Sequence, residues 1–195
     1  MLGVLIASSM PIVIAVVVVF VLLGLFFVFA YNGLVQRRNE TKNAWSQIDV
    51  QLKRRHDLIP NLVETAKGYM THERETFEAV TNARAAAVSV SGGSVAAQAG
   101  AEGILGQVMS RFMAVAENYP DLKANENFLA LQEELSSTEN KISFSRQFYN
   151  DSVLKYNNKT QAIPYNVVAA IGGFKDAEFF EIQDAVERAV PKVSF

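Results

Sequence analysis

The stretch PIVIAVVVVFVLLGLFFVFAY, residues 11–31, carries no charged side chain, and the rest of the chain is organised around it. About 20 helical residues at ~1.5 Å each span the ~30 Å hydrocarbon core of a bilayer. A lone strand cannot do so, because its backbone groups would stay unpaired in lipid. Pro11 suits a helix start and Tyr31 suits the level of the lipid headgroups. The stretch therefore predicts a transmembrane helix within residues 1–31.

A cleaved signal peptide is the competing interpretation of the same stretch. Val28 and Ala30 have the small-residue spacing of a cleavage site. However, no basic residue precedes the apolar run, and the run is longer than the ~7–15 apolar residues of a signal peptide. We therefore expect an uncleaved anchor.

The charges that flank the stretch predict its orientation. Only the α-amino group precedes it, whereas Arg37, Arg38 and Lys42 follow it. Basic flanking residues stay on the cytoplasmic side of a membrane. We expect a single-pass protein of the inner (cytoplasmic) membrane, with its N-terminus outside and residues 32–195 in the cytoplasm. The absence of cysteine agrees with a reducing compartment.

Residues 32–195 are long enough for one domain, and their apolar residues recur with helical spacing. The first run of regularly spaced apolar residues forms a stripe along one helix, and Arg55 occupies a position of this stripe where an apolar residue is skipped. Pro60 also lies within the stripe, so we expect a kink of the helix near Pro60, with a helix break as the alternative. The stripe shifts by one residue after Tyr69, continues to Ala87 and ends in a flexible loop over residues 89–94. Its first members are Trp45, Ile48, Leu52, Ile59, Leu62, Ala66 and Tyr69.

Two further long helices are predicted, over about residues 96–118 and 125–163. The later one has a seven-residue repeat, which predicts a seam packed against other helices. Phe144 and Phe148 are expected to widen its buried face. Polar residues beside the seam favour an antiparallel bundle over a two-stranded coiled coil. The repeat consists of Phe128, Leu135, Ile142, Tyr149, Tyr156 and Ile163, and the polar residues are Thr138, Ser145, Ser152 and Lys159.

The C-terminal part of the chain is predicted to be helical as well. Pro164 ends the preceding helix, residues 171–174 form a turn, and a short amphipathic helix is expected over residues 176–190. No segment alternates with a period of two, so no sheet is expected. The predicted fold is all-α: an N-terminal transmembrane helix followed by an antiparallel long-helix bundle, similar to a four-helix bundle.

The side chains that carry chemistry form no catalytic or metal-binding motif. The two histidines are His56 and His72, and neither has the second histidine of a zinc-protease motif or the preceding carboxylate of a di-iron bundle. Cysteine is absent, and no serine lies in a Gly-x-Ser-x-Gly setting. We expect both histidines to make hydrogen bonds within the bundle and the acidic residues of 133–139 to be solvated. No enzyme, cofactor or metal is predicted.

Four of the six tyrosines are followed by asparagine. Asparagine is a middling helix former that tends to hydrogen-bond the backbone. The pairs predict interhelical hydrogen bonds that fix the register of the helices, and a polar binding groove is the alternative. They are Tyr31-Asn32, Tyr149-Asn150, Tyr156-Asn157 and Tyr165-Asn166.

Many short stretches after residue 31 resemble the LemA family. The resemblance leaves out a variable-looking region over residues 89–106, and Phe148 interrupts it. It implies a bacterial protein with one N-terminal membrane helix and an antiparallel helical bundle, and it brings no established enzymatic activity and no catalytic residue. The stretches are Tyr31–Val35, Arg37–Asn39, Ala44–Thr65, Gly68-Tyr69, His72-Glu73, Ala83–Ala85, Leu129–Leu135, Thr138–Asn140, Arg146-Gln147 and Tyr149-Asn150.

The preferred hypothesis is a non-enzymatic, membrane-anchored scaffold or adaptor that acts through protein contacts. The expected partners are the lipid bilayer, an unidentified protein and a second copy of the chain, and no nucleic acid is expected. The alternative is a metal-dependent or hydrolytic accessory protein that uses His56, His72 and nearby carboxylates. The predicted interaction face consists of Arg54, Arg55, His56, Asn61 and Glu64.

Overall fold

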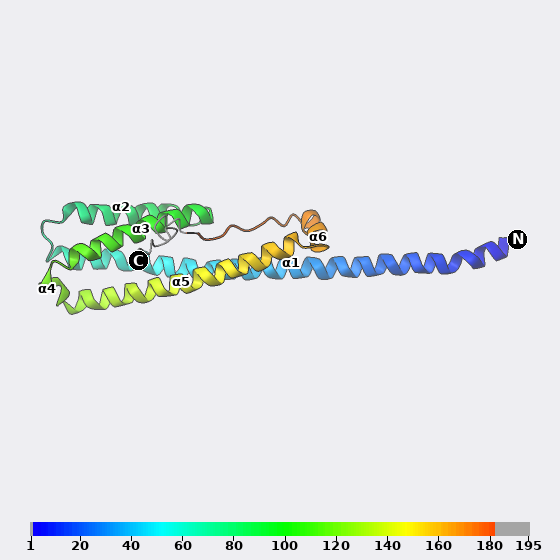
Figure 1. Ribbon diagram of the computed structural model, residues 1–195, viewed down its shortest axis with the longest axis horizontal. Helices are drawn as coiled ribbons and strands as arrows, with labels where there is room; N and C mark the ends of the chain where they lie inside the picture. Colours follow the sequence, from blue (N-terminus) through cyan, green and yellow to red (C-terminus); the bar gives the residue numbers. More distant parts are fainter. Residues whose placement is uncertain (1, 182–195) are drawn as a thin grey trace, which may run out of the picture. The chain divides into compact units, whose positions relative to one another are not determined.

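A computed structural model describes residues 2–181, with side chains described at residue 10 and from residue 13 onward. No residue from 2 to 181 lies in a strand, so the all-α prediction is confirmed. The helices of this range are α1 (Leu2–Lys67), α2 (Arg74–Ser89), α3 (Val95–Ala116), α4 (Pro120–Lys123), α5 (Glu126–Gln161) and α6 (Tyr165–Gly172), which Figure 1 labels.

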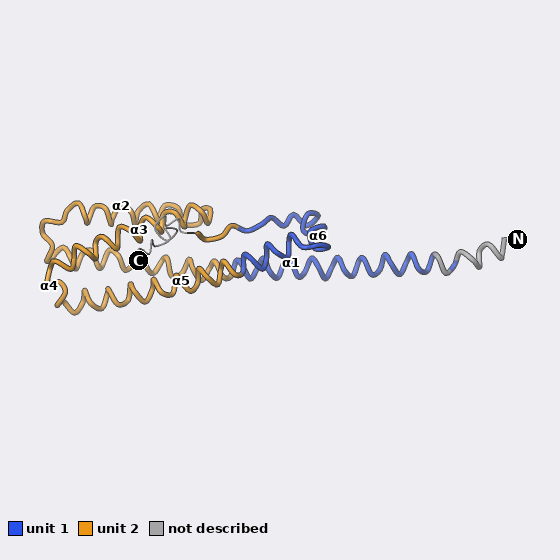
Figure 2. The backbone as a smooth tube through the Cα atoms, viewed as in Figure 1, with its two compact units in different colours: residues 1–42, 152–177 blue, residues 43–151, 178–195 orange. Residues whose placement is uncertain are grey.

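The chain divides into two compact units, drawn in blue and orange in Figure 2. Unit 1 consists of residues 1–42 and 152–177, and unit 2 consists of residues 43–151 and 178–195. The helices α1 and α5 each contribute one part to each unit. Each unit has a buried apolar cluster of its own.

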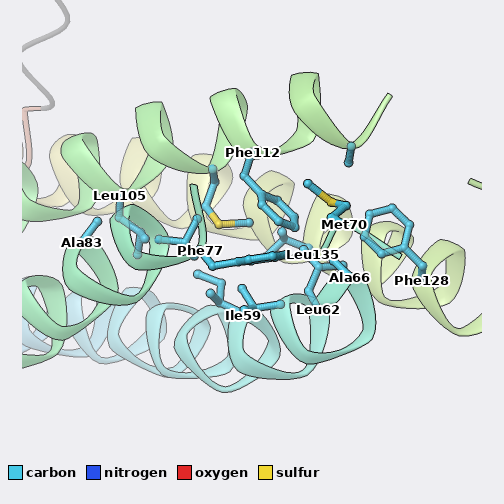
Figure 3. Close-up of a cluster of buried hydrophobic side chains, with 14 of the residues drawn as sticks. Ile59, Leu62, Ala66, Met70, Phe77, Ala83, Leu105, Phe112, Phe128 and Leu135 are labelled. Carbon is cyan, nitrogen blue, oxygen red and sulfur yellow. The ribbon is translucent and has the colours of Figure 1, made fainter. Parts of the chain in front are cut away.

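Unit 2 is a bundle built from part of α1, all of α2 and α3, and part of α5. The short loop over residues 90–94 reverses the chain, so that α2 and α3 pack side by side and run antiparallel (Figure 1). The rings of Phe77 and Phe112 lie 6.1 Å apart inside the bundle. Figure 3 shows this core, which includes Ile59, Leu62, Ala66, Met70, Phe77, Ala83, Leu105, Phe112, Phe128 and Leu135. The prediction of an antiparallel bundle is confirmed.

The first long helix, α1, continues through Pro60 to Lys67, so the alternative of a helix break at Pro60 is wrong. The chain instead leaves the helix at Gly68, and α2 begins at Arg74. The predicted one-residue shift of the apolar stripe marks this turn. Met70 is buried in the bundle core, whereas the predicted stripe residue Tyr69 is 39% exposed.

The seven-residue repeat of α5 is confirmed from its start at Phe128 through Tyr156, where every member is at most 8% exposed. Its predicted last member, Ile163, lies beyond the end of α5 and is 84% exposed. The predicted widening of the buried face is also wrong, because Phe144 and Phe148 are 73% and 53% exposed. Phe144 follows a seam residue by two positions, which on an α-helix rotates it by about 200°, away from the core.

Unit 1 joins the first part of α1 to the end of α5 and to α6. The sequence pattern does not predict α6, because Pro164 indicates only the end of the preceding helix. Gly173 follows α6 with a φ of +67°, a left-handed conformation in which glycine avoids the strain of a Cβ atom. The core of unit 1 consists of Ala30, Leu34, Tyr156, Val168, Ala169 and Phe174.

Residues 174–181, which we call the strap, carry no helix. The predicted amphipathic helix over residues 176–190 is therefore wrong for residues 176–181, and residues 182–190 lie outside the described part of the chain. Phe180 is nevertheless buried, at 1% exposed, so its predicted apolar role is kept without the predicted helix.

The first part of α1 has the composition of a membrane-spanning helix. Its most apolar window has a mean hydropathy of 3.3, and 6% of that window is buried in the protein. Within the described residues it is the one helix long and apolar enough to cross a membrane, a test that an N-terminal signal sequence also passes.

Candidate functional site

The five residues of the predicted interaction face lie on α1 in unit 2, but they do not share one environment. Arg55 and His56 are buried, at 6% and 5% exposed, whereas Arg54, Asn61 and Glu64 are exposed. The periodicity of the sequence had already placed Arg55 in the apolar stripe. Arg55 and His56 therefore serve the interior of the bundle, and three of the five residues stay available at its surface.

Arg55 and His56 share the carboxylate of Glu102, a residue of α3 that is 2% exposed. Arg55 Nη1 donates to Glu102 Oε2 at 3.2 Å, and His56 Nε2 lies 2.6 Å from Glu102 Oε1. Arg55 Nη2 also donates to Glu139 Oε1 on α5, at 3.3 Å. A buried charge is tolerated only when it is paired and hydrogen-bonded. These contacts therefore fix α1, α3 and α5 at one level of the bundle.

Helix α2 reaches the same level through Arg84, whose Nε donates to the backbone carbonyl of His56 at 2.6 Å. In an α-helix this carbonyl accepts from the N–H of the residue four positions later, which here is Pro60 and has no N–H. Arg84 replaces the missing donor, which explains why α1 continues through a proline. We call Arg55, His56, Arg84, Glu102 and Glu139 the polar hub.

The exposed members of the predicted face make surface contacts. Arg54 forms an ion pair with Glu134 on α5, and Glu64 pairs with Lys67 at 3.0 Å. Surface pairs of this kind contribute about 0–1 kcal/mol each. Because Glu134 and Glu139 both bind arginines of α1, the prediction that the acidic residues of 133–139 are merely solvated is wrong for these two.

The two histidines lie in different surroundings. His56 belongs to the polar hub, which confirms its predicted hydrogen bonding within the bundle. His72 is exposed in the connection between α1 and α2. Among the residues that the structure describes, no group of three or more His, Cys, Asp or Glu side chains is placed to hold a metal ion.

In unit 2, Tyr149 and Asn150 hold the backbone of the strap. Tyr149 Oη donates to the carbonyl of Glu178 at 2.8 Å. Asn150 Oδ1 accepts from the N–H of Phe180 at 2.9 Å, and its Nδ2 donates to the carbonyl of Phe180 at 3.2 Å. Burial raises the pKa of Tyr149 to about 12, with a smaller contribution from the negative charge of Glu178. The hydroxyl of Tyr149 therefore stays a donor at neutral pH.

In unit 1, Tyr156 and Asn157 make the same contacts with an earlier part of the strap. Tyr156 Oη donates to the carbonyl of Lys175 at 2.9 Å. Asn157 exchanges two hydrogen bonds with Ala177, at 2.9 Å to its N–H and 3.0 Å to its carbonyl. Burial raises the pKa of Tyr156, opposed by the positive charge of Arg38.

The two Tyr-Asn pairs stand seven residues apart on α5, and the residues they bind stand three residues apart in the strap. For Tyr149-Asn150 and Tyr156-Asn157, the predicted interhelical hydrogen bonds are therefore wrong. The pairs bind a non-helical backbone, as the neighbouring strand of a sheet would.

A hydrophobic groove in unit 2 lies between α1 and α5. Phe144 and Val50 are 73% and 62% exposed at this groove. A second hollow along α5 shares Phe144 and Lys141 with it and extends to Leu129. Contiguous exposed apolar patches are typical of binding surfaces, which makes this groove a candidate. We call this surface the Phe144 groove, and it is lined by Ser46, Gln47, Val50, Gln51, Lys141, Phe144 and Ser145.

Neither the partners of the polar hub nor the Phe144 groove was predicted from the sequence. A signal for the hub was present, because Glu102 lies on the apolar stripe of α3 as Arg55 lies on that of α1. A positive and a negative residue, each on the buried stripe of a different helix, indicate an ion pair between the two helices. The groove was missed because Phe144 had been placed in the core.

The LemA family matches residues 44–195, which is most of the chain. The chain belongs to the LemA family. The match confirms the resemblance drawn from the sequence. It includes the whole polar hub and the Phe144 groove, so both features lie in the LemA region.

Named relatives agree with this assignment. The magnetosome proteins MamQ 2 and MamQ 1 of Paramagnetospirillum magneticum are each 27% identical to this LemA chain over 179 residues, covering 80% of it. The protein LemA of Metamycoplasma hominis is 29% identical over 154 residues, covering 75% of this chain and 68% of its own length. The chain spans 66% of the length of the two MamQ relatives.

Proposed function

We propose that this LemA-family protein is a membrane-anchored scaffold without enzymatic activity, which recruits a protein partner to the membrane. The first part of α1 serves as the anchor, and unit 2 presents the surface that binds the partner.

The anchor is supported by the exposed apolar surface of α1. Only 6% of the most apolar window of α1 is buried in the protein, so lipid can surround this segment on most sides. Arg37, Arg38 and Lys42 follow this segment and favour a cytoplasmic position for the remaining chain.

Partner binding is supported chiefly by the exposure of Phe144. Aromatic side chains are enriched among the residues that dominate binding energy in protein interfaces, and the described part of the chain leaves Phe144 73% exposed. Val50 extends the apolar area onto α1, and Lys141 gives the groove a positive charge. We infer a partner segment with an apolar side chain for the groove and an acidic residue for Lys141.

Site-specific photocrosslinking in native membranes tests this proposal. A photoreactive phenylalanine replaces Phe144 in the full-length protein, and a matched control replaces Val88, which is 43% exposed on α2. We expect a discrete protein adduct from position 144 that is absent from position 88. An adduct with lipid alone, or equal adducts from both positions, would contradict partner binding at the groove.

The predicted surface residues are tested against the groove in the same experiment. Lys141→Glu is expected to abolish the adduct, while Asn61→Ala and Glu64→Ala leave it unchanged if the groove alone binds. Loss of the adduct in the Asn61 or Glu64 variant alone would move the binding surface to the originally predicted face.

The anchor and its orientation are tested with a single cysteine, since the chain has none of its own. A cysteine at the exposed position Glu75 is expected to resist an impermeant maleimide in intact cells and to react after lysis. The protein is expected to stay in the membrane at alkaline pH. Labelling in intact cells would refute the orientation, and release at alkaline pH would refute the anchor.

A further inference from the structure

The short helix α6 packs against the part of α1 where the apolar segment ends. Val168 and Ala169, each 3% exposed, form one core with Ala30 and Leu34. The ring of Tyr165, at the start of α6, lies 5.9 Å from the ring of Phe26. All of these residues belong to unit 1. Helix α6 therefore lies beside residues 26–34 of α1, at the level where the proposed anchor leaves the hydrocarbon.

The opposite face of α6 is apolar and uncovered. Val167 and Ile171 are 59% and 70% exposed, and Ile163, just before the helix, is 84% exposed. Val167 and Ile171 are four residues apart on α6 and therefore share one side of the helix, whereas Ile163 lies outside it. The sequence of α6, YNVVAAIG, contains no charged residue. Such a surface is costly in water, at about 25 cal/mol for each Å² of apolar area.

Polar and aromatic side chains around α6 are those of a membrane interface. Lys159 Nζ lies 5.1 Å from the centre of the Tyr165 ring, and the ring of Tyr31 lies 5.3 Å from that of Phe174. Lysine extends its charge to the headgroups while its methylene groups lie along apolar surface, and tyrosine rings gather at the same depth. Gly33 makes room for Lys159, since a Cβ atom there would come within 2.5 Å of its Nζ.

We propose that α6 is a second membrane-contacting element, which inserts Val167 and Ile171 into the lipid next to the anchor. This inference rests on the proposed anchor. The occupant is lipid because α6 packs beside a part of α1 whose remaining apolar side chains are exposed as well, with Leu25 and Phe29 at 59% and 83%. A short apolar helix beside a spanning helix lies ~5–10 Å deep, at the boundary of headgroups and acyl chains.

Fluorescent labelling of single cysteines tests the proposal in the full-length protein. The chain is reconstituted in vesicles of phosphatidylcholine and phosphatidylglycerol, with an environment-sensitive label at position 167 or 171. The control label is at Lys155, an exposed residue of α5 in the same unit. We expect blue-shifted emission and strong quenching by lipid-borne nitroxides at 167 and 171, with iodide quenching dominant at 155.

A label at Leu22 separates failure of this inference from failure of the anchor. If the label at 22 is quenched by lipid nitroxides while 167 and 171 respond like 155, the anchor stands and the role of α6 is refuted. If the label at 22 is also quenched only by iodide, the anchor itself is refuted. Ile171→Glu is expected to reduce lipid quenching at 167 and to leave quenching at 22 unchanged, and equal quenching at 167 in both proteins would overturn the proposal.

Discussion

Replacing Arg84 by methionine should destabilise unit 2 in a way that depends on Pro60. Methionine keeps most of the length of the arginine side chain but removes the donor to the His56 carbonyl, whose usual helical donor, the N–H of residue 60, is absent in proline. A hydrogen bond to a charged group contributes about 1.5–3 kcal/mol, so we expect Arg84→Met to reduce the free energy of unfolding by roughly that amount.

The double-mutant cycle with Pro60→Ala isolates this hydrogen bond. Alanine at position 60 restores an N–H that can bind the His56 carbonyl, and by itself it should stabilise α1 by up to about 3 kcal/mol. In that background the cost of Arg84→Met should fall, giving a coupling energy of about 1–2 kcal/mol.

Urea unfolding of the full-length protein in detergent measures both values. The single tryptophan, Trp45, reports on unit 2, because its ring lies 5.2 Å from Tyr149 and 5.7 Å from Phe180. The free energy is taken from the unfolding curves of the four variants. If Arg84→Met has the same cost with proline and with alanine at position 60, Arg84 does not replace the missing donor.

Two other substitutions and one pH titration test separate features. Glu102→Ala leaves Arg55 and His56 without their shared carboxylate and should reduce the free energy of unfolding by about 3–5 kcal/mol in the same urea assay. A reduction below ~1 kcal/mol would show that the hub is not buried. In the difference between the absorbance titrations of the unchanged protein and Tyr149→Phe, Tyr149 should titrate with a pKa of about 12. Its contribution to stability is therefore complete below pH 10, the ordinary pKa of tyrosine, and is lost as the pH rises through 12. A step at pH 10 in this difference would refute its burial. Asn150→Asp removes the donor to the strap and should speed hydrogen exchange at residues 178–181, whereas the exposed Asn158→Asp should not.

The sequence predicted the helices well because their apolar periodicity is long and regular. The α5 repeat holds over five members, and the buried stripe of α1 even includes the charged Arg55 in its correct place. The one-residue shift of the apolar stripe at Tyr69 indicated where the first turn lies. A change of register does not by itself distinguish a bend from a reversal of the chain.

The missed features depend on contacts between residues far apart in the chain. The effect of Pro60 depends on Arg84, 24 positions later, and periodicity within one helix contains no trace of that hydrogen bond. Helix α6 has eight residues, too few for a periodic pattern to stand out. The Tyr-Asn pairs were noticed, but their role depends on a backbone segment that looked amphipathic and was therefore expected to be a helix.

The Tyr-Asn pairs of α5 bind the strap mainly through its backbone N–H and carbonyl groups. These backbone contacts decide which substitutions the strap can accept. The exposed side chains of Lys175 and Glu178 lend only their carbonyl groups to the tyrosines, so many residue types should serve at these two positions. Proline should not be accepted at Ala177 or Phe180, since both donate their N–H to an asparagine. In a saturation library of the strap, most side chains should therefore be tolerated at the exposed positions, whereas residues that change the backbone should not. A packed helix at the same place would show the reverse.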